Sequence, residues 1–298
     1  MLVSIFTPTF NRGYIISNLY YSLKRQTTKD FEWIIVDDGS SDNTMDLINN
    51  FILNESDFNI ILINVKNGGK HRAINKGLKF AKGKLFFIVD SDDYLTDDAV
   101  QNIIEFESTI SDDLKNEFAG ICLNRGYSNN ELIGTTFEDK DKGKGFIDIT
   151  MLERPKFNIF GDKAEVFYTD ILKKYPFPEF EGENFLTECI VWDQIAYDGL
   201  KLRFFNNIIY ICNYLPDGLT SNENKLFGAN PAGYGLYIYQ CGKFGKKTGI
   251  AKWDSYYNFY CRNVSKLGIK TVAKYLHIKP TELVWRVFGL KIFYKLYS

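Results

Sequence analysis

Four short, mostly apolar runs alternate with amphipathic segments along the first 110 residues, and this alternation limits the fold more than any other feature. The apolar runs are residues 2–6, 33–36, 60–63 and 85–89. Apolar side chains at helical spacing mark residues 14–25, 43–51, 70–81 and 97–110. Strands and helices that alternate in this way form a parallel sheet covered by helices on both faces. In such sheets ligands bind beyond the carboxyl ends of the strands.

The fourth apolar run ends in a cluster of carboxylates. Asp90, Asp92 and Asp93 follow residues 85–89 directly. Clustered carboxylates repel one another, so their position at the end of a buried strand requires an explanation. A divalent cation would provide one, because hard cations prefer carboxylate oxygens. A helix N-terminus capped by Ser91, Asp92 or Asp93 would provide another, and this stretch alone leaves both open.

Polar loops also follow the first two predicted strands. Residues 7–12 come after the first strand and residues 37–42 after the second. Because parallel strands bring their carboxyl ends to one edge, we expect both loops to lie beside residues 90–93 and to form one site. The loop after the first strand lacks the Gly-x-Gly-x-x-Gly pattern, and the chain contains no P-loop motif. The sequence therefore argues against dinucleotide-binding and P-loop proteins.

Four motifs in order carry a family resemblance: residues 4–12, 35–42, 67–75 and 90–93. Together they resemble the inverting family 2 glycosyltransferases of the GT-A fold, strongly over residues 1–110 and more weakly to about residue 220. The resemblance implies an α/β fold with a Rossmann-like, mostly parallel sheet flanked by helices. It also implies a catalytic domain over residues 1–222, with a nucleotide-sugar-binding half in 1–110 and an acceptor half in 111–222.

The resemblance implies a UDP-sugar pocket at the carboxyl edge of the sheet. Asp37 would accept a hydrogen bond from the uracil ring, whose N3–H requires an acceptor. Asp90 and Asp92 would hold Mg²⁺ or Mn²⁺ against the donor diphosphate, and the cation would stabilise the departing nucleoside diphosphate. Asp93 could support the sugar or orient Asp92. The expected nucleotide-sugar-binding residues are Thr7, Pro8, Thr9, Arg12, Asp37, Lys70, Asp90, Ser91 and Asp92.

Other polar residues of these motifs receive structural interpretations or none. Asp38 is interpreted as a turn residue before Gly39, and Asp42 as a helix cap. His71 and Arg72, which follow Lys70, stay open between a role in nucleotide binding, a solvent-facing position and pairing with an acidic neighbour. This leaves Lys70 as the predicted cation of the glycine-containing loop 67–70.

An inverting transferase also needs a general base that deprotonates the acceptor hydroxyl. In the family this base belongs to a Glu-Asp pair at the start of a helix, and Glu188-Cys189 matches that position. We therefore expect Glu188 to be the base, with Glu183 and Asp193 as alternatives. Charge stabilisation of the helix start is the structural alternative for Glu188. Residues 216–221 resemble the segment of the family that can fold over the donor.

The C-terminal part, residues 223–298, is predicted to be a helical, aromatic-rich extension. From residue 266 onward it carries six lysines and Arg286 against a single acid, Glu282. A basic, aromatic, amphipathic segment suits peripheral contact with a membrane surface or a lipid-linked acceptor. Packing against the catalytic domain or against a second subunit explains the pattern equally well.

Composition narrows the partners and the location. The 36 basic and 37 acidic residues give a net charge of −1, so nucleic acid is not an expected partner. Five scattered cysteines favour reduced thiols in a cytoplasmic protein. No signal peptide and no membrane-spanning run is evident, so we expect a cytoplasmic protein that could act at the inner face of the membrane.

The sequence thus predicts a metal-assisted hexosyltransferase that moves a sugar from a UDP-sugar to a saccharide or lipid-linked saccharide. A nucleotidyltransferase that forms nucleotide sugars is one alternative, but residues 7–12 lack the glycine-rich basic loop expected there. A non-catalytic nucleotide-sugar-binding protein is the other. Neither the sugar nor the acceptor can be read from these motifs.

Overall fold

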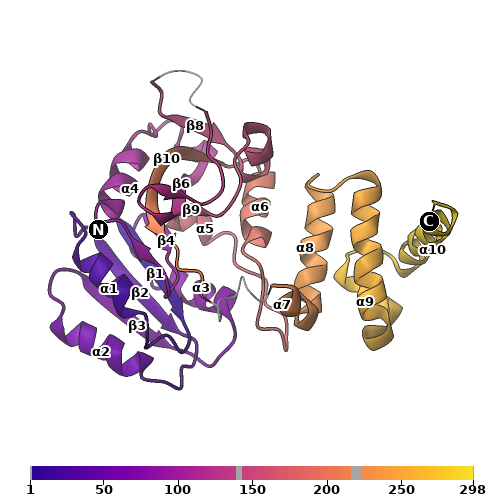
Figure 1. Ribbon diagram of the computed structural model, residues 1–298, viewed down its shortest axis with the longest axis horizontal. Coiled ribbons are helices and arrows are strands. Elements are labelled where there is room, and N and C mark those ends of the chain that lie inside the picture. The colour runs from indigo at the N-terminus through magenta and orange to yellow at the C-terminus, as the bar shows by residue number, and fades with distance from the viewer. Residues whose placement is uncertain (1, 139–142, 216–222, 298) are drawn as a thin grey trace.

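The protein is built on one mixed sheet with helices on both faces, followed by a row of C-terminal helices (Figure 1). The computed structural model describes residues 2–138, 143–215 and 223–297. Within these residues the main strand order is β3-β2-β1-β4-β9-β6-β10-β5, with β7 beside β6 and β8 beside β10. The strands are β1 (Val3–Thr9), β2 (Phe31–Asp37), β3 (Asn59–Asn64), β4 (Leu85–Ile88), β5 (Tyr94–Leu95), β6 (Phe118–Ser128), β7 (Glu131–Leu132), β8 (Phe146–Ile149), β9 (Lys163–Tyr168) and β10 (Lys201–Ile211).

The first half of the sheet is parallel, as the sequence predicts. Strand β1 pairs in parallel with β2 and β4, and β2 pairs in parallel with β3. Beyond β4 the sheet is mixed, because β9 is antiparallel to both β4 and β6 while β10 is parallel to β6. Residues 201–211 form the single strand β10, whose register against β6 shifts between Phe204 and Ile208.

Among the described residues, six helices surround the sheet and four form the C-terminal region. Those around the sheet are α1 (Ser17–Lys24), α2 (Thr44–Asn54), α3 (Lys70–Leu78), α4 (Ala99–Ser108), α5 (Thr169–Leu172) and α6 (Cys189–Tyr197). Those of the C-terminal region are α7 (Glu223–Ala229), α8 (Pro231–Lys243), α9 (Gly249–Tyr275) and α10 (Pro280–Tyr297). Short 3₁₀ segments occupy Lys115–Glu117 and Met151–Phe157.

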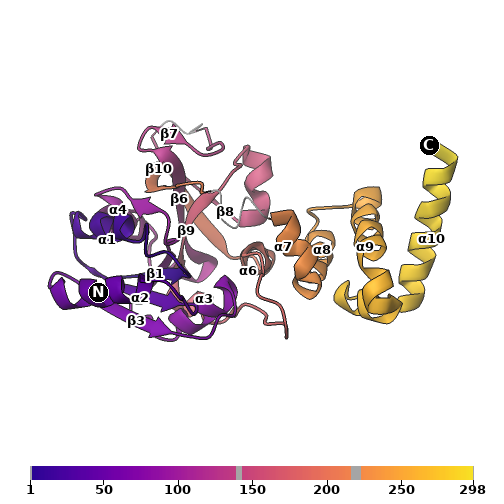
Figure 2. The same cartoon turned by 60° about the horizontal axis from the view of Figure 1, so that its bottom comes forward.

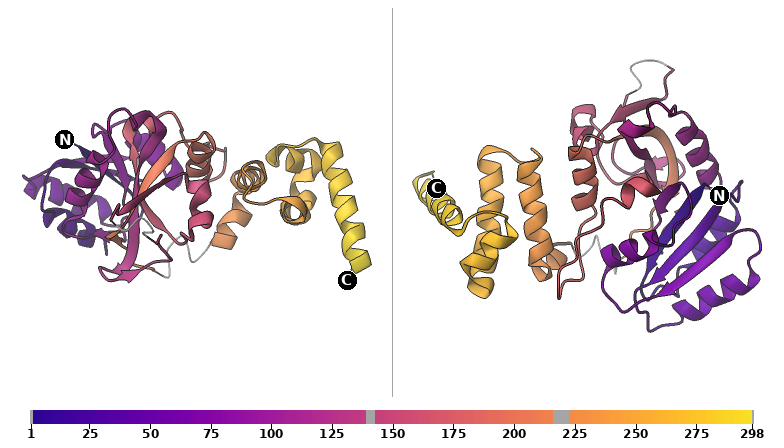
Figure 3. Two further views of the ribbon diagram at one scale, coloured as in Figure 1. Left: turned by 90° about the horizontal axis from the view of Figure 1, so that it is seen from above. Right: turned by 180° about the vertical axis from the view of Figure 1, so that it is seen from behind.

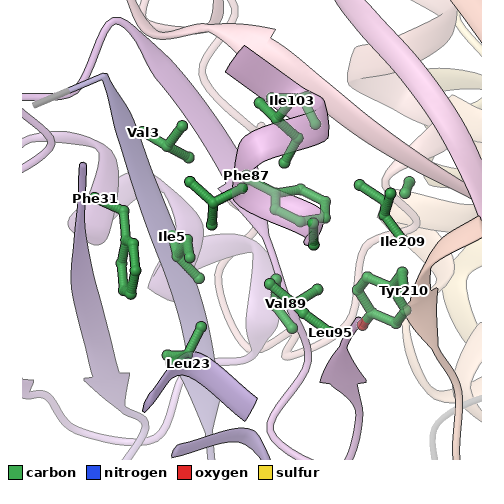
Figure 4. Close-up of a cluster of buried hydrophobic side chains, with 14 of the residues drawn as sticks. Val3, Ile5, Leu23, Phe31, Phe87, Val89, Leu95, Ile103, Ile209 and Tyr210 are labelled. Carbon is green, nitrogen blue, oxygen red and sulfur yellow. The ribbon is translucent and has the colours of Figure 1, made fainter. Parts of the chain in front are cut away.

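Both faces of the central strands are buried, which explains their continuous apolar runs. Ile5 and Phe87 belong to the core on one face (Figure 4), whereas their neighbours Phe6 and Phe86 belong to the core on the other. Successive residues of a strand point to opposite faces, so one apolar run supplies both cores. Helices α1, α2 and α4 cover the first face, and α3 and α6 cover the second.

The C-terminal helices extend away from the sheet in the order α8, α9, α10 (Figures 2 and 3). Helix α8 and the turn after it are tied to α6, since Lys246 Nζ lies 2.7 Å from Asp193 Oδ2 and the Tyr197 and Phe244 rings stack with centroids 4.5 Å apart. Helices α8, α9 and α10 share a small core of their own, around Phe259. The predicted helical C-terminal region is thus confirmed, while the membrane contact expected for residues 266–298 stays a prediction.

The helices described in the structure do not include one that is both long and apolar enough to cross a bilayer. The segment 216–221, predicted to resemble a closing loop, lies outside the described residues. The domain boundaries at residues 110 and 222 stay predictions.

Candidate active site

A cavity of about 570 Å³ opens at the carboxyl edge of β1 and β4, where the sequence predicts a site. All three predicted loops contribute to it, together with the glycine loop before α3 and two segments from the second half of the chain. The lining includes Pro8, Thr9, Arg12, Asp38, Lys70, Asp90, Ser91, Asp92, Asp93, Arg125, Asn184, Phe185, Leu186, Asn213, Tyr214 and Leu226. The structure therefore brings together residues that are far apart in sequence.

Two of the predicted nucleotide-binding residues lie beneath this lining. Thr7 is fully buried, and its hydroxyl oxygen accepts the indole N–H of Trp33 at 2.9 Å. Asp37 is also fully buried, and its carboxylate accepts both the backbone N–H of Ser40, at 3.0 Å, and the Ser40 hydroxyl. A carboxylate has acceptor capacity beyond these two bonds, so the uracil contact of Asp37 stays a prediction.

Asp38 and Asp42 hold loops in place, but the N-cap residue of α2 is Asn43 and not Asp42 as predicted. The Asp38 carboxylate accepts the N–H groups of Gly68 and Gly69, each at 2.8 Å. This ties the loop after β2 to the loop before α3, and burial raises the pKa of Asp38 in spite of the two bonds. Asp42 accepts the N–H of Thr44, the first residue of α2, at 3.0 Å.

Lys70 lies between two carboxylates from different parts of the chain. Its Nζ is 2.6 Å from Asp90 Oδ1 and 2.9 Å from Glu188 Oε1. Burial disfavours the charged ammonium, but the two carboxylates outweigh this effect and raise the pKa of Lys70. The lysine is therefore charged, and it joins the metal motif predicted at β4 to the predicted base at the start of α6.

The carboxylates of residues 90–93 have different environments. Burial favours the neutral acid at Asp90, but Lys70, Arg125 and Arg12 together lower its pKa. Burial and the neighbouring Asp90 charge raise the pKa of Asp92, although Arg12 Nη2 lies 3.8 Å from its Oδ2. Three cations thus face Asp90, whereas the charge of Asp92 is only partly compensated.

Asp93 anchors the loop to β10. Its carboxylate accepts the Tyr210 hydroxyl and the backbone N–H of Asn213, both at 2.7 Å. The Tyr210 hydroxyl oxygen in turn accepts the N–H of Asp90 at 2.9 Å. Burial and the charge of Asp90 raise the pKa of Asp93 to about 7. Asp93 therefore fixes the conformation of residues 90–93 by bonding to β10 and to the residues that follow it.

The donor set fits a cation that shares its ligands with a substrate. In the described part of the chain no three His, Cys, Asp or Glu side chains converge as a complete metal site. Asp90 and Asp92 offer two carboxylates at the cavity. Burial and then repulsion from Asp90 raise the pKa of Asp92, and a bound cation would offset both effects. Mg²⁺ commonly binds through one or two carboxylates plus substrate phosphates, and Mn²⁺ accepts the same hard oxygen ligands.

Arg125 is a cavity residue that the sequence reasoning missed. It lies on β6, its guanidinium carbon is 4.1 Å from the centroid of the Tyr210 ring, and its Nε donates to the Lys163 carbonyl at 2.7 Å. Burial opposes its charge, but the surrounding groups, Tyr210 first, raise its pKa. An arginine within a strand that is otherwise buried was the available signal, because buried arginines require a partner.

The three candidate bases have different surroundings. Glu188 does not line the cavity itself but contacts Lys70, which does. The carboxylate of Glu183 is buried and accepts the N–H groups of Ala232 and Gly233 at the start of α8, while Asp193 pairs with Lys246. Of the three, Glu188 is therefore the one that pairs with a cation lining the cavity.

Comparison with known proteins points to a family. Residues 4–131 match the family model described as glycosyl transferase family 2. This region runs from within β1 to the first residue of β7 and includes the whole edge from residue 7 to residue 93. The family match therefore covers the same part of the chain that carries the four motifs.

Curated relatives align with only part of the chain. A chondroitin synthase of Pasteurella multocida is 40% identical over 100 residues, which are 34% of this chain and 10% of that protein. A poly(ribitol-phosphate) beta-glucosyltransferase of Bacillus spizizenii is 34% identical over 116 residues, 38% of this chain and 18% of that protein. An uncharacterized glycosyltransferase of Haemophilus influenzae is 26% identical over 63% of this chain and 72% of its own length. The alignments thus span only a small part of the first two relatives.

Solved structures share the fold over nearly the whole chain. TarS residues 1–349 of S. aureus, in complex with UDP-GlcNAc, superpose with a TM-score of 0.59 at 19% identity, covering 97% of this chain and 79% of that one. A mannosyltransferase of Pyrobaculum calidifontis, in complex with GDP-Man and Mn²⁺, gives 0.53 at 16% identity, covering 97% and 80%. The predicted α/β fold of the GT-A type is confirmed.

Proposed function

We propose that this protein is an inverting glycosyltransferase that moves a sugar from a UDP-sugar to a saccharide or lipid-linked saccharide. One observation carries the proposal: Lys70 joins Asp90 and Glu188 at a cavity on the carboxyl edge of the sheet. This arrangement would bring a donor-side carboxylate, a cation and a candidate base together in one ion-paired group. The glycosyl transferase family 2 match and the UDP-GlcNAc complex of TarS support a UDP-sugar as donor.

The cationic side chains and the carboxylates have different proposed roles toward the donor. Arg12, Lys70 and Arg125 supply positive charge for the diphosphate, and Asp90 and Asp92 would hold Mg²⁺ or Mn²⁺. When bound, the cation would act as a Lewis acid for the departing nucleoside diphosphate. Thr7, Pro8, Thr9, Asp37 and Ser91 complete the proposed nucleotide-sugar-binding set.

Glu188 takes the proton from the acceptor hydroxyl as that oxygen attacks the sugar on the face opposite the leaving diphosphate. In the structure its carboxylate is 2.9 Å from Lys70 Nζ. A diphosphate in the cavity would compete with Glu188 for the same ammonium. Donor binding would thereby free the Glu188 carboxylate for the acceptor hydroxyl.

A screen of UDP-sugars for metal-dependent UDP release in the presence of saccharide acceptors tests the proposal. The variant Glu188→Gln should bind UDP like the wild type but lose transfer by about 10²- to 10⁴-fold, the range of general-base contributions. Release of pyrophosphate would instead indicate a nucleotidyltransferase. UDP binding without consumption of any UDP-sugar would indicate a non-catalytic binding protein.

We further propose that the outermost C-terminal helices meet an anionic membrane surface. Trp285 is 77% exposed, and Val284 and Ile250 are also exposed. Arg286 lies over the Trp253 ring, with its guanidinium carbon 4.2 Å from the centroid. Exposed tryptophan beside basic residues suits the headgroup region of a bilayer. The cytoplasmic location and a possible self-association of the chain both stay predictions.

A further inference from the structure

The segment that leads to Glu188, residues 177–188, is held by α3 on one side. Arg72 donates from its guanidinium to the backbone carbonyls of Phe180 and Glu183. Asn75 donates to the Phe177 carbonyl and accepts the Phe177 N–H, both at 2.9 Å. The helix that begins with Lys70 therefore also fixes the backbone of the segment that ends at Glu188.

The glycine loop before α3 contacts the same segment directly. Gly69 has φ +94°, and a Cβ at this position would lie 1.8 Å from the carbonyl oxygen of Asn184. This close approach is possible only without a side chain. Asn184, Phe185 and Leu186 then line the cavity.

The junction between α7 and α8 holds the segment from the other side. The amide oxygen of Asn230 accepts the N–H groups of Asn184, at 2.8 Å, and Phe185, at 3.1 Å. Its Nδ2 donates to the carbonyl of Leu226 in α7 at 2.8 Å, and Leu226 itself lines the cavity. Asn230 is only 6% exposed, so these backbone groups depend on it rather than on water.

Glu183 completes an exchange of hydrogen bonds between the segment and α8. Its carboxylate accepts the N–H of Ala232 at 2.6 Å and of Gly233 at 2.9 Å, both donors that a helix N-terminus leaves without an intrahelical acceptor. The charge also interacts favourably with the helix dipole. Asn230 thus accepts hydrogen bonds from N–H groups of the segment, and Glu183 of the segment accepts hydrogen bonds from N–H groups of α8.

We propose that Asn230 and Glu183 are positioning residues, which hold the backbone of residues 184–188 so that Glu188 meets the acceptor hydroxyl. This inference rests on the proposed function. It makes α7 and the start of α8 part of the catalytic unit, not an appendage to it. Displacement of a reacting group by about 1 Å can reduce a rate about 10²-fold, so bonds distant from the reacting atoms can control turnover.

Three variants test the inference. Asn230→Ala removes the shared acceptor, Asn230→Asp retains an oxygen there, and Phe244→Ala removes a ring from the other end of the contact between α6 and α8. We expect kcat to fall about 10- to 100-fold in Asn230→Ala. The affinity for UDP should change less than about threefold, and Asn230→Asp should recover several-fold in kcat. Phe244→Ala should lower the melting temperature while leaving kcat near the wild-type value.

Other outcomes would overturn it. Retention of kcat in Asn230→Ala, no recovery in Asn230→Asp, or an equal loss of kcat in Phe244→Ala would each reduce Asn230 to a general structural role. Should Asn230→Ala not fold, Glu183→Gln, which keeps one oxygen acceptor, should still lower kcat about 10-fold, and full activity in that variant would contradict the inference. If the wild type consumes no UDP-sugar, the proposed function fails; if it does and these variants match it, only the positioning inference fails.

Discussion

The ammonium group of Lys70 lies 2.9 Å from the carboxylate of Glu188, and the same ammonium reaches Asp90 at 2.6 Å. Lys70 begins α3, Glu188 immediately precedes α6, and Asp90 follows β4. One side chain therefore connects the half of the sheet that carries the donor motifs with the segment that carries the candidate base. Two carboxylates share one cation, so loss of that cation affects both of them.

Replacement of Lys70 by methionine should weaken donor binding and slow transfer. Lys70→Met leaves Asp90 and Glu188 without their shared cation and removes a charge-assisted contact to the diphosphate. We expect the affinity for UDP, measured by calorimetry, to fall about 10- to 100-fold, in line with hydrogen bonds to charged groups. Lys79→Met, at the exposed end of the same helix, should bind like the wild type. An affinity within threefold of the wild type would contradict the role of Lys70.

The proposed cation predicts a dependence on chelators and on Asp92. Transfer should stop in EDTA and return with Mg²⁺ or Mn²⁺, and Asp92→Ala should raise the metal concentration needed for half-maximal rate at least about 10-fold. The control is Asp112→Ala, which removes an exposed carboxylate that pairs with Lys115 outside the cavity lining. Full transfer by Asp92→Ala at limiting metal would contradict the role of Asp92 as a metal ligand.

Gly69→Ala should destabilise the fold and distort the site. The added Cβ would meet the Asn184 carbonyl oxygen at 1.8 Å, and the residue would also be held at φ +94°. Gly199→Ala separates the two effects, because Gly199 has φ +91° but a Cβ added there would meet nothing within 4 Å. By urea denaturation we expect a loss of about 1 kcal/mol for Gly199→Ala and at least about twice that for Gly69→Ala. Equal losses would mean that Asn184 moves away freely.

His71 should make the stability depend on pH on the acid side. It is buried next to Lys70 on α3, and burial, with the neighbouring Arg72, lowers its pKa to about 4. The unfolded chain takes up this proton near pH 6.5, so the stabilisation is complete above that pH and is lost as the pH falls through about 4. Between pH 7.5 and 4.5 the free energy of unfolding should fall by about 2–3 kcal/mol more in the wild type than in His71→Leu. Parallel pH profiles for the two proteins would contradict this.

Membrane contact predicts a specific role for Trp285. The full chain should sediment with vesicles that contain phosphatidylglycerol, and high salt should weaken the association, because the attraction is partly electrostatic. Trp285→Ala should weaken it about 10-fold, whereas Leu53→Ala, which alters another highly exposed apolar residue on α2, should not. Absence of vesicle association in the wild type would contradict membrane contact and would favour a protein partner for the exposed face of α10.

The sequence by itself determined the parallel half of the sheet and the edge that carries the cavity. Apolar runs such as residues 85–89 report burial on both faces, and the polar loops that follow them must gather where parallel strands end. Lys70, Asp90 and Asp92 line the cavity for this reason. The helical nature of the C-terminal region also follows from local periodicity.

The tertiary structure alone decided the features that depend on pairing between distant segments. Strand β9 lies antiparallel between β4 and β6, which no local pattern indicates. Arg125 reaches the cavity only because β6 lies beside β9 and β10. The Glu183 carboxylate accepts hydrogen bonds from α8 only because the folded chain brings α8 next to it. Local sequence records whether a side chain is buried. The identity of its hydrogen-bond partner depends on which segments the folded chain brings together.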